Sequence, residues 1–195
     1  MGSAELCDRV VQAAEAAGFE YLLIPVGSTC WEASRQAWEM SAKHSDVHLF
    51  WGDLPERIAD KIAEIREMAK AHGRDNDIGF GMRLQVICRE DEKDAWEAAD
   101  ILVRNATERQ KQDMKTLYNN SAANQRVQQL AREHGDLLLP HLWTGITRVR
   151  PGAGIAVVGN PRQCADTLQR FIDVGCHSFC LSAICMTRKP SAWDG

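Results

Sequence analysis

Short apolar runs typical of buried strands alternate along this chain with segments that have the apolar spacing of helices. The strand-like runs span residues 21–26, 47–51, 78–88 and 177–182. One helical segment between them places Ile58, Ile62 and Ile65 on a single face. Strands and helices that alternate at this length form right-handed βαβ units around a parallel sheet. The pattern therefore predicts an α/β fold, as a barrel or an open sheet, with the helices on one side.

Two residues are predicted to begin helices. Asp53 lies two positions before Pro55, and we expect its side chain to cap the helix that follows. Asn160 stands directly before Pro161, which is an N-cap residue followed by a proline at the first helical position. We expect this second helix to end near Val174.

A polar stretch interrupts the alternation between residues 105 and 150. It is rich in Gln and Asn, and both Gly135 and the pair Asn119 and Asn120 would break a long helix. We therefore expect a single domain over residues 1–195 that carries a mobile helical insertion at 105–150. A lid is the alternative interpretation, because long insertions in compact domains are often functional.

The charge balance argues against nucleic acid and membrane surfaces as partners. The formal net charge is −4, the isoelectric point is near 5.9, and Lys and Arg form no run. No apolar stretch approaches the ~20 residues that a membrane span requires. The first residues also lack the basic and apolar regions of a secretory signal. We expect a cytoplasmic protein whose partners are small molecules.

Neither the cysteines nor the histidines predict a metal site. The seven cysteines include no Cys-x-x-Cys pair, so reduced and mostly buried thiols are the simplest interpretation. His44 and His48 have ligand-like spacing, but they straddle a helix end and a strand start and should not share a face. We therefore expect no bound metal.

Three features indicate where a ligand would bind. Trp51 ends a predicted strand, which is where α/β barrels place their active sites. Arg83 lies in an otherwise apolar strand, so a buried guanidinium there needs an anionic partner, either a carboxylate of the protein or a ligand. Arg150 belongs to the loop 148–154, whose glycines free N–H groups for a phosphate or a sulfonate. A solvated loop with ordinary surface arginines is the alternative.

Four stretches, in order, resemble the flavin-dependent alkanesulfonate monooxygenases of the luciferase-like superfamily. They are GFEYLLIPVG at 18–27 with Cys30, HLFWGDLPE at 48–56, GFGMRLQVICR at 79–89, and RPGAG at 150–154 continuing to Gly159. The resemblance extends from the first helix to Ser182, and the ordered series is more specific than any one stretch.

The resemblance implies a bacterial luciferase-like (β/α)8 TIM barrel that uses reduced FMN (FMNH2), supplied by a NAD(P)H:FMN reductase. With O2, such enzymes cleave alkanesulfonates to an aldehyde and sulfite. The resemblance further implies catalytic or substrate-contacting roles for Cys30, Trp51, Arg83 and Arg150, and cofactor-binding roles for Ser34, Arg150, Gly152 and Gly154.

The chain departs from this family in its length and at two positions. Strands of the family's barrel are missing between Cys30 and Ser34, and 195 residues are too few to close a barrel of ~250, so we expect an incomplete TIM barrel. Gln85 and Ile184 stand where the family has a histidine and a tyrosine, so we expect slow turnover or none. One alternative is a catalytically silent flavin- or anion-binding module that completes its sheet as a homo-oligomer. Another is a different luciferase-like flavin or F420 oxidoreductase.

Overall fold

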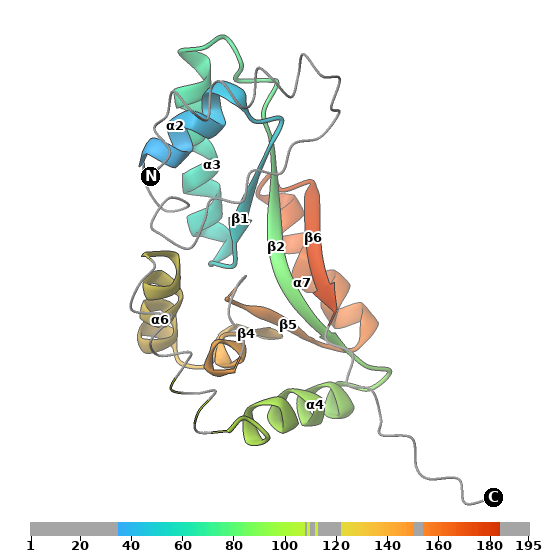
Figure 1. The fold of residues 1–195 in the computed structure, drawn as a ribbon. Coiled ribbons are helices and arrows are strands. Elements are labelled where there is room, and N and C mark those ends of the chain that lie inside the picture. The colour runs from blue at the N-terminus through green and yellow to red at the C-terminus, as the bar shows by residue number, and fades with distance from the viewer. Residues whose placement is uncertain (1–34, 108, 110–111, 113–121, 150–153, 184–195) are drawn as a thin grey trace, which may run out of the picture.

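A computed structural model describes residues 35–107, 109, 112, 122–149 and 154–183 (Figure 1). The helices are α2 (Arg35–His44), α3 (Pro55–Lys70), α4 (Glu92–Arg104), α6 (Ala122–His134) and α7 (Pro161–Asp173), with a short 3-10 helix η1 (Gly145–Arg148). The strands are β1 (Val47–Trp51), β2 (Gly79–Cys88), β3 (Leu137–Leu139), β4 (Leu142–Trp143), β5 (Ala156–Gly159) and β6 (Ser178–Ala183). The strand predicted at 21–26 lies outside the described residues.

The long strand β2 organises the sheet, and three other strands run parallel to it. The backbone N–H groups of Gly79 and Gln85 lie on the same edge of β2. The Gly79 N–H donates to the carbonyl of Asp46, just before β1, and the Gln85 N–H donates to the carbonyl of Ile155, just before β5. Strands β1 and β5 therefore pair with successive parts of this edge. The carbonyl of Phe80 points to the other edge, where the N–H of His177 at the start of β6 donates to it. The parallel strands predicted at 47–51, 78–88 and 177–182 are thereby confirmed.

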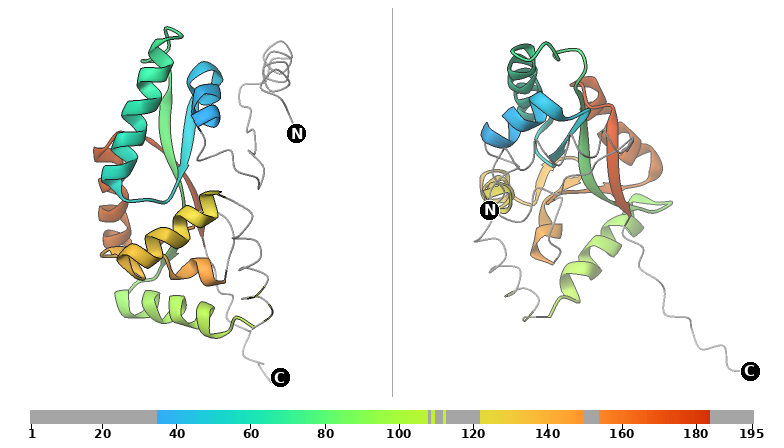
Figure 2. Two further views of the ribbon diagram at one scale, coloured as in Figure 1. Left: turned by 90° about the vertical axis from the view of Figure 1, so that its left-hand side faces the viewer. Right: turned by 45° about the horizontal axis from the view of Figure 1, so that its top comes forward.

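The sheet is curled rather than flat, and it forms part of a barrel. Figure 1 shows β5 and β4 running across the lower part of β2, with β1 beside its upper part and β6 beside its middle, and Figure 2 shows the same sheet from two further sides. The described residues contribute six strands to this sheet, in a mixed α/β arrangement. The prediction of an α/β fold with an incomplete (β/α)8 barrel is confirmed.

The segment predicted as a helical insertion is helical in only part of its described length. Residues 122–134 form α6, but β3 and β4 then form an antiparallel pair, and β4 joins β5. Apolar residues explain the difference, because Leu138, Leu142 and Trp143 are buried in the sheet. The prediction of a helical insertion rested on the polar composition of residues 105–134 and did not take account of the apolar residues that follow them.

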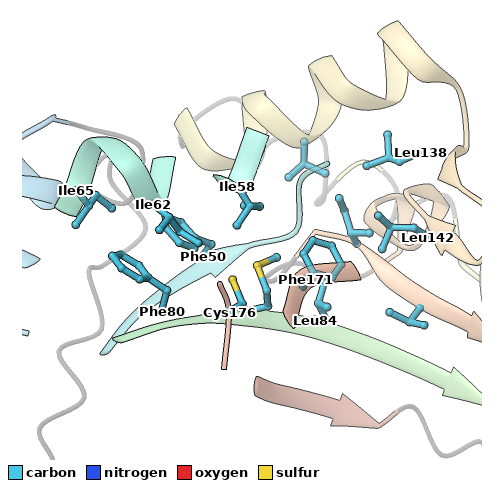
Figure 3. Close-up of a cluster of buried hydrophobic side chains, with 14 of the residues drawn as sticks. Phe50, Ile58, Ile62, Ile65, Phe80, Leu84, Leu138, Leu142, Phe171 and Cys176 are labelled. Atoms are coloured by element: carbon cyan, nitrogen blue, oxygen red, sulfur yellow. The ribbon is translucent and has the colours of Figure 1, made fainter. Parts of the chain in front are cut away.

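A large apolar core fills one face of the sheet. Alternate residues of β2, Phe80, Met82 and Leu84, point into it and meet Ile58 and Ile62 of α3. Figure 3 shows Phe80, Leu84, Ile58 and Ile62 together with Phe171 of α7 and with Leu138 and Leu142 of the β3–β4 segment. Helices α3 and α7 therefore cover the same face, as the prediction of helices on one side requires.

Helix α4 departs from that prediction, because it covers the opposite face. A second apolar cluster joins Ala95 and Ala99 of α4 to Ile87, Ala156 and Val158, whose side chains alternate with those of the first core. The cause is the position of β5 on the same edge of β2 as β1. A right-handed connection from β2 back to that edge has to cross the other face.

The two predicted helix starts have different outcomes. Asn160 caps α7 as predicted, and it forms a full capping box in which its side chain accepts from the Gln163 N–H and the Gln163 side chain accepts from the Asn160 N–H. Asp53 does not cap α3. The N-cap is Leu54, with Pro55 at the first helical position, and Asp53 Oδ1 accepts the N–H of Leu54 instead.

Candidate functional site

The second face of the sheet carries polar residues on β2 and β6, although Leu49 of β1 also lies on it, beside Gly81. Between Phe80, Met82 and Leu84, β2 places Gly81, Arg83 and Gln85 on this face. The strand register adds Trp51 of β1 beside Arg83, and it adds Ser178, Cys180 and Ser182 of β6 beside these three residues of β2. We call the seven residues Trp51, Gly81, Arg83, Gln85, Ser178, Cys180 and Ser182 the polar face.

The central row of the polar face consists of Trp51, Arg83 and Cys180. Arg83 is the register partner of Trp51 on one side and of Cys180 on the other, so the three residues cross three adjacent strands. Trp51 is half-buried and also packs against the first apolar core, whereas Arg83 and the free thiol of Cys180 are exposed. The row combines an aromatic surface, a cation and a thiol, which suits an anionic ligand with a planar ring.

Arg83 has no hydrogen-bond or ion-pair partner among the residues that the structure describes. The sequence had left open a structural salt bridge or a ligand as its partner. Exposure removes the desolvation penalty that would have required a salt bridge, so the guanidinium is free to contact a bound anion.

Gln85 lies one row further along β2, between Ala156 of β5 and Ser182 of β6. Its side chain is 2% exposed, and its Oε1 atom is buried without a hydrogen-bond partner. A buried amide oxygen without a partner is uncommon and unfavourable. Packing alone therefore does not explain why a polar amide occupies position 85.

Gly81 makes the close spacing of this face possible. A Cβ atom at this position would collide with the carbonyl oxygen of Ser178 and with the side chain of Leu49. Strand β6 can therefore approach β2 only because residue 81 has no side chain.

Of the residues assigned to the site from the sequence, the structure brings together Trp51 and Arg83. Cys30, Ser34, Arg150 and Gly152 lie outside the described residues, so their roles stay predictions. Gly154 is described, has a φ of 73°, and would place a Cβ atom 2.6 Å from Cγ2 of Val127. Packing against α6 thus accounts for this glycine, and its predicted contact with a flavin phosphate stays untested.

Sequence reasoning missed Cys180 and Ser182 as members of the face. The signal was present, because β6 continues the polar alternation that β2 shows at Gly81, Arg83 and Gln85. What the sequence lacked was the pairing of β6 with β2, which sets Cys180 beside Arg83.

A buried carboxylate lies just beyond the end of β1. Asp53 is 1% exposed, and its Oδ2 atom lies 2.7 Å from Nζ of Lys61 and 3.7 Å from Nε of Arg126. Arg57 approaches Oδ1 at 3.9 Å and also contacts Glu133 of α6 at 3.3 Å. These ion pairs fasten α6 to the start of α3, so they have a structural explanation.

Other polar and titratable groups have structural roles or lie away from this face. His48 points to the apolar core, where burial and, secondarily, the charge of Lys61 lower its pKa to about 4. Arg148 pairs with Asp136.

An open hollow of about 360 Å³ beside Arg66, Lys70 and Asp75 lies near the start of β2, away from the row of Trp51 and Arg83. Within the described ranges, no three His, Cys, Asp or Glu side chains form a metal-ligand group, and no described helix is long and apolar enough to cross a membrane.

Solved structures of several enzymes are similar to this chain, and two of them share its fold with TM-scores above 0.5. The chain matches the EDTA monooxygenase EmoA from Chelativorans sp. BNC1 with a TM-score of 0.57 at 15% identity, covering 84% of this chain and 42% of that one. It matches a riboflavin lyase, RcaE, described with modified FMN and the substrate riboflavin, with a TM-score of 0.52 at 16% identity, covering 79% and 37%. A coenzyme F420-dependent tetrahydromethanopterin reductase from Methanopyrus kandleri matches at 12% identity with a TM-score of 0.46, covering 77% and 42%.

At these identities the first two matches show a shared fold only. The chain spans between 37% and 42% of the length of the three structures. A family model for luciferase-like monooxygenases matches residues 33–178. That range includes α2 to α7 and the described strands up to the first residue of β6. The chain belongs to the luciferase-like monooxygenase family.

Proposed function

We propose that this chain is a flavin-binding oxidoreductase of the alkanesulfonate monooxygenase type, with slow turnover on its own. The observation that supports this most is Arg83, an exposed cation without a partner among the described residues, set beside Trp51 on the polar face. A guanidinium of this kind can donate two parallel hydrogen bonds to a sulfonate or a phosphate. The indole offers a surface on which a flat ring can pack.

The residues of the polar face fit a reduced flavin. Trp51 can contact the ring system, Arg83 can neutralise an anionic group, and the amide of Gln85 can bond to a polar ring edge. When bound, reduced flavin would supply the two electrons with which O2 is activated. The deazaflavin F420 is the alternative cofactor, because its ring and its anionic tail have the same kinds of groups.

The proposed substrate is an alkanesulfonate, with O2 as the second substrate and aldehyde and sulfite as products. Arg83 would hold the sulfonate, and Arg150, outside the described residues, is proposed to share this charge. A separate NAD(P)H:FMN reductase would supply FMNH2. This substrate class rests on the sequence resemblance and on the cation at the centre of the face.

Slow turnover follows from the groups that the polar face lacks. Its seven residues include no histidine, carboxylate or tyrosine, and Gln85 cannot gain or lose a proton near neutral pH. General acid–base catalysis typically contributes ~10²–10⁴-fold to a rate. A catalytically silent flavin- or anion-binding module is therefore the second candidate, and Gln85 is the observation that favours it.

Pairing with a second copy is part of the proposal. No described strand pairs with the outer edge of β1 or of β6, and Leu181 on β6 is 46% exposed. Unpaired edges of this kind tend to pair with another chain. Light scattering of the purified protein would measure the mass in solution, and a strict monomer would contradict this part.

Anaerobic titration with FMNH2, followed by a sulfite assay, tests the proposal. Binding of FMNH2 and of 1-octanesulfonate should weaken about tenfold in Arg83→Met, the loss expected for one charge-assisted hydrogen bond. Arg162→Met, at a 91% exposed side chain on α7, is the matched control and should leave binding unchanged. With reductase, NADH, O2 and octanesulfonate, sulfite should appear slowly. Equal binding in the wild type and Arg83→Met would reject the site.

A further inference from the structure

The buried amide of Gln85 is unfavourable for folding as it stands. Its side chain is 2% exposed, and Oε1 has no hydrogen-bond partner within the described structure. A side chain of similar size without polar atoms, such as leucine or methionine, would fill the same space without leaving an unpaired acceptor. The amide therefore needs a reason other than packing.

The immediate neighbours of Gln85 do not supply a partner. Ala156, on β5, has no polar side-chain atom, and Ser182, on β6, does not donate a hydrogen bond to the amide oxygen. The residue shares its face with the exposed Arg83 one row away. The unpaired oxygen and the unpaired cation thus lie two residues apart on the same face of one strand.

The type of missing partner follows from the type of atom. An amide oxygen accepts hydrogen bonds, so the absent group has to carry an N–H or O–H donor. An alkanesulfonate has only acceptor oxygens and cannot fill this role. A flavin ring carries an N–H group, so it can satisfy Gln85, and when no sulfonate is bound its anionic phosphate can pair with Arg83.

We infer that Gln85 is a ligand-binding residue whose amide oxygen accepts a hydrogen bond from a ring N–H of a bound flavin or deazaflavin. This inference rests on the proposed function, because it assumes that the polar face holds such a ring. Gln85 then selects the cofactor, whereas Arg83 alone suffices for a donor-free anion. Because an amide does not titrate, Gln85 itself adds no pH dependence to binding.

The test measures stability and affinity in the same variants. Gln85→Leu and Gln85→Met should raise the melting temperature by about 3 °C, because they remove an unpaired buried acceptor. The same variants should weaken FMN binding about tenfold and leave octanesulfonate binding unchanged. Gln169→Leu, at an exposed glutamine of α7, is the matched control and should change neither affinity.

Opposite changes in stability and FMN affinity are the result that a purely structural glutamine would not produce. A lower melting temperature with unchanged FMN affinity in both variants would overturn the inference. If Arg83→Met then still lost octanesulfonate binding, the proposed anion site would stand and only the inference about Gln85 would fall. If FMN binding depended on Gln85 but not on Arg83, the inference would stand and the anion site would be rejected. A wild-type protein that binds no FMN would overturn both.

Discussion

Nζ of Lys61 lies 2.7 Å from Oδ2 of Asp53, and that carboxylate is only 1% exposed. Arg57 and Arg126 approach the same carboxylate at 3.9 Å and 3.7 Å. Because Arg126 belongs to α6 and Lys61 to α3, one buried anion holds together two helices that are distant in the sequence. Asp53 is thus a structural centre beside the polar face.

Replacing Asp53 with Asn should lower the free energy of unfolding by about 2 kcal/mol. Removing one partner of a buried ion pair leaves the other charges uncompensated, and partial exposure of Lys61 reduces the penalty below the value for a fully buried pair. Urea denaturation would measure the change. Asp166→Asn removes an exposed pair with Arg162 and should change stability by less than about 0.5 kcal/mol. Equal effects of the two substitutions would contradict the structural role of Asp53.

His48 should make the protein less stable as the pH falls from about 6.5 to about 4. Burial, with a smaller contribution from Lys61, lowers its pKa from 6.5 in the unfolded chain to about 4 in the folded protein. The stabilisation is complete above the unfolded pKa, and it is lost as the unfolded chain alone takes up the proton. The loss should reach up to about 3 kcal/mol by pH 4.

The pH dependence can be assigned to His48 by substitution. Its Nδ1 lies 2.8 Å from Oγ of Ser41 and its ring lies 4.5 Å from that of Phe50, so Gln can replace part of the polar contact. Urea midpoints of His48→Gln should therefore vary less between pH 6.5 and pH 4 than those of the wild type. His72→Gln, at an exposed position after α3, should keep the wild-type slope. An unchanged slope in His48→Gln would refute the assignment.

Substituting Asn160 with Ala should destabilise the protein by about 1 kcal/mol. The change removes the side-chain acceptor for the N–H of Gln163, at 2.9 Å, and opens the capping box at the start of α7. Thermal unfolding would measure it. Asn76→Ala, at an exposed asparagine before β2, should have almost no effect. Asn160→Asp, which keeps an acceptor at the helix N-terminus, should recover most of the lost stability.

Local patterns in the sequence were sufficient to predict the parallel strands and the cap of α7. The alternation of Phe80, Met82 and Leu84 with Gly81 and Arg83 depends only on the period of a strand, so it is visible without a structure. Trp51 could be assigned to the site from the rule about strand ends, and Arg83 from its charge within an otherwise apolar strand.

Local patterns in the sequence do not predict which distant strands pair in the sheet. The place of β5 on the same edge of β2 as β1, and hence the position of α4, depends on which distant strands meet. The same limit hid the contact of Cys180 with the site, since it arises from the pairing of β6 with β2. Asp53 was misassigned as a cap because its three cationic neighbours lie on α3 and α6 and outweigh a helix N–H.

The thiols offer a test of where the ligand binds. Burial, and to a smaller extent Cys88, raises the pKa of Cys164 to about 12, and burial raises that of Cys176 to about 11. Both thiols should react slowly with iodoacetamide at neutral pH, because the thiolate is the reactive form. Cys180 is exposed, so it should be alkylated faster than either.

Saturating FMN should slow the alkylation of Cys180 several-fold and leave Cys164 and Cys176 unchanged. Cys180 is the register partner of Arg83, which in turn neighbours Trp51, so a flavin ring on the polar face would cover the thiol. Peptide mapping by mass spectrometry separates the three cysteines and gives a rate for each. Protection should be lost in Arg83→Met, where FMN binds more weakly, and retained in Arg162→Met. If FMN bound to the wild type with measurable affinity and Cys180 were still alkylated at its original rate, the ligand would have to lie elsewhere, and the row of Trp51, Arg83 and Cys180 would not be its site.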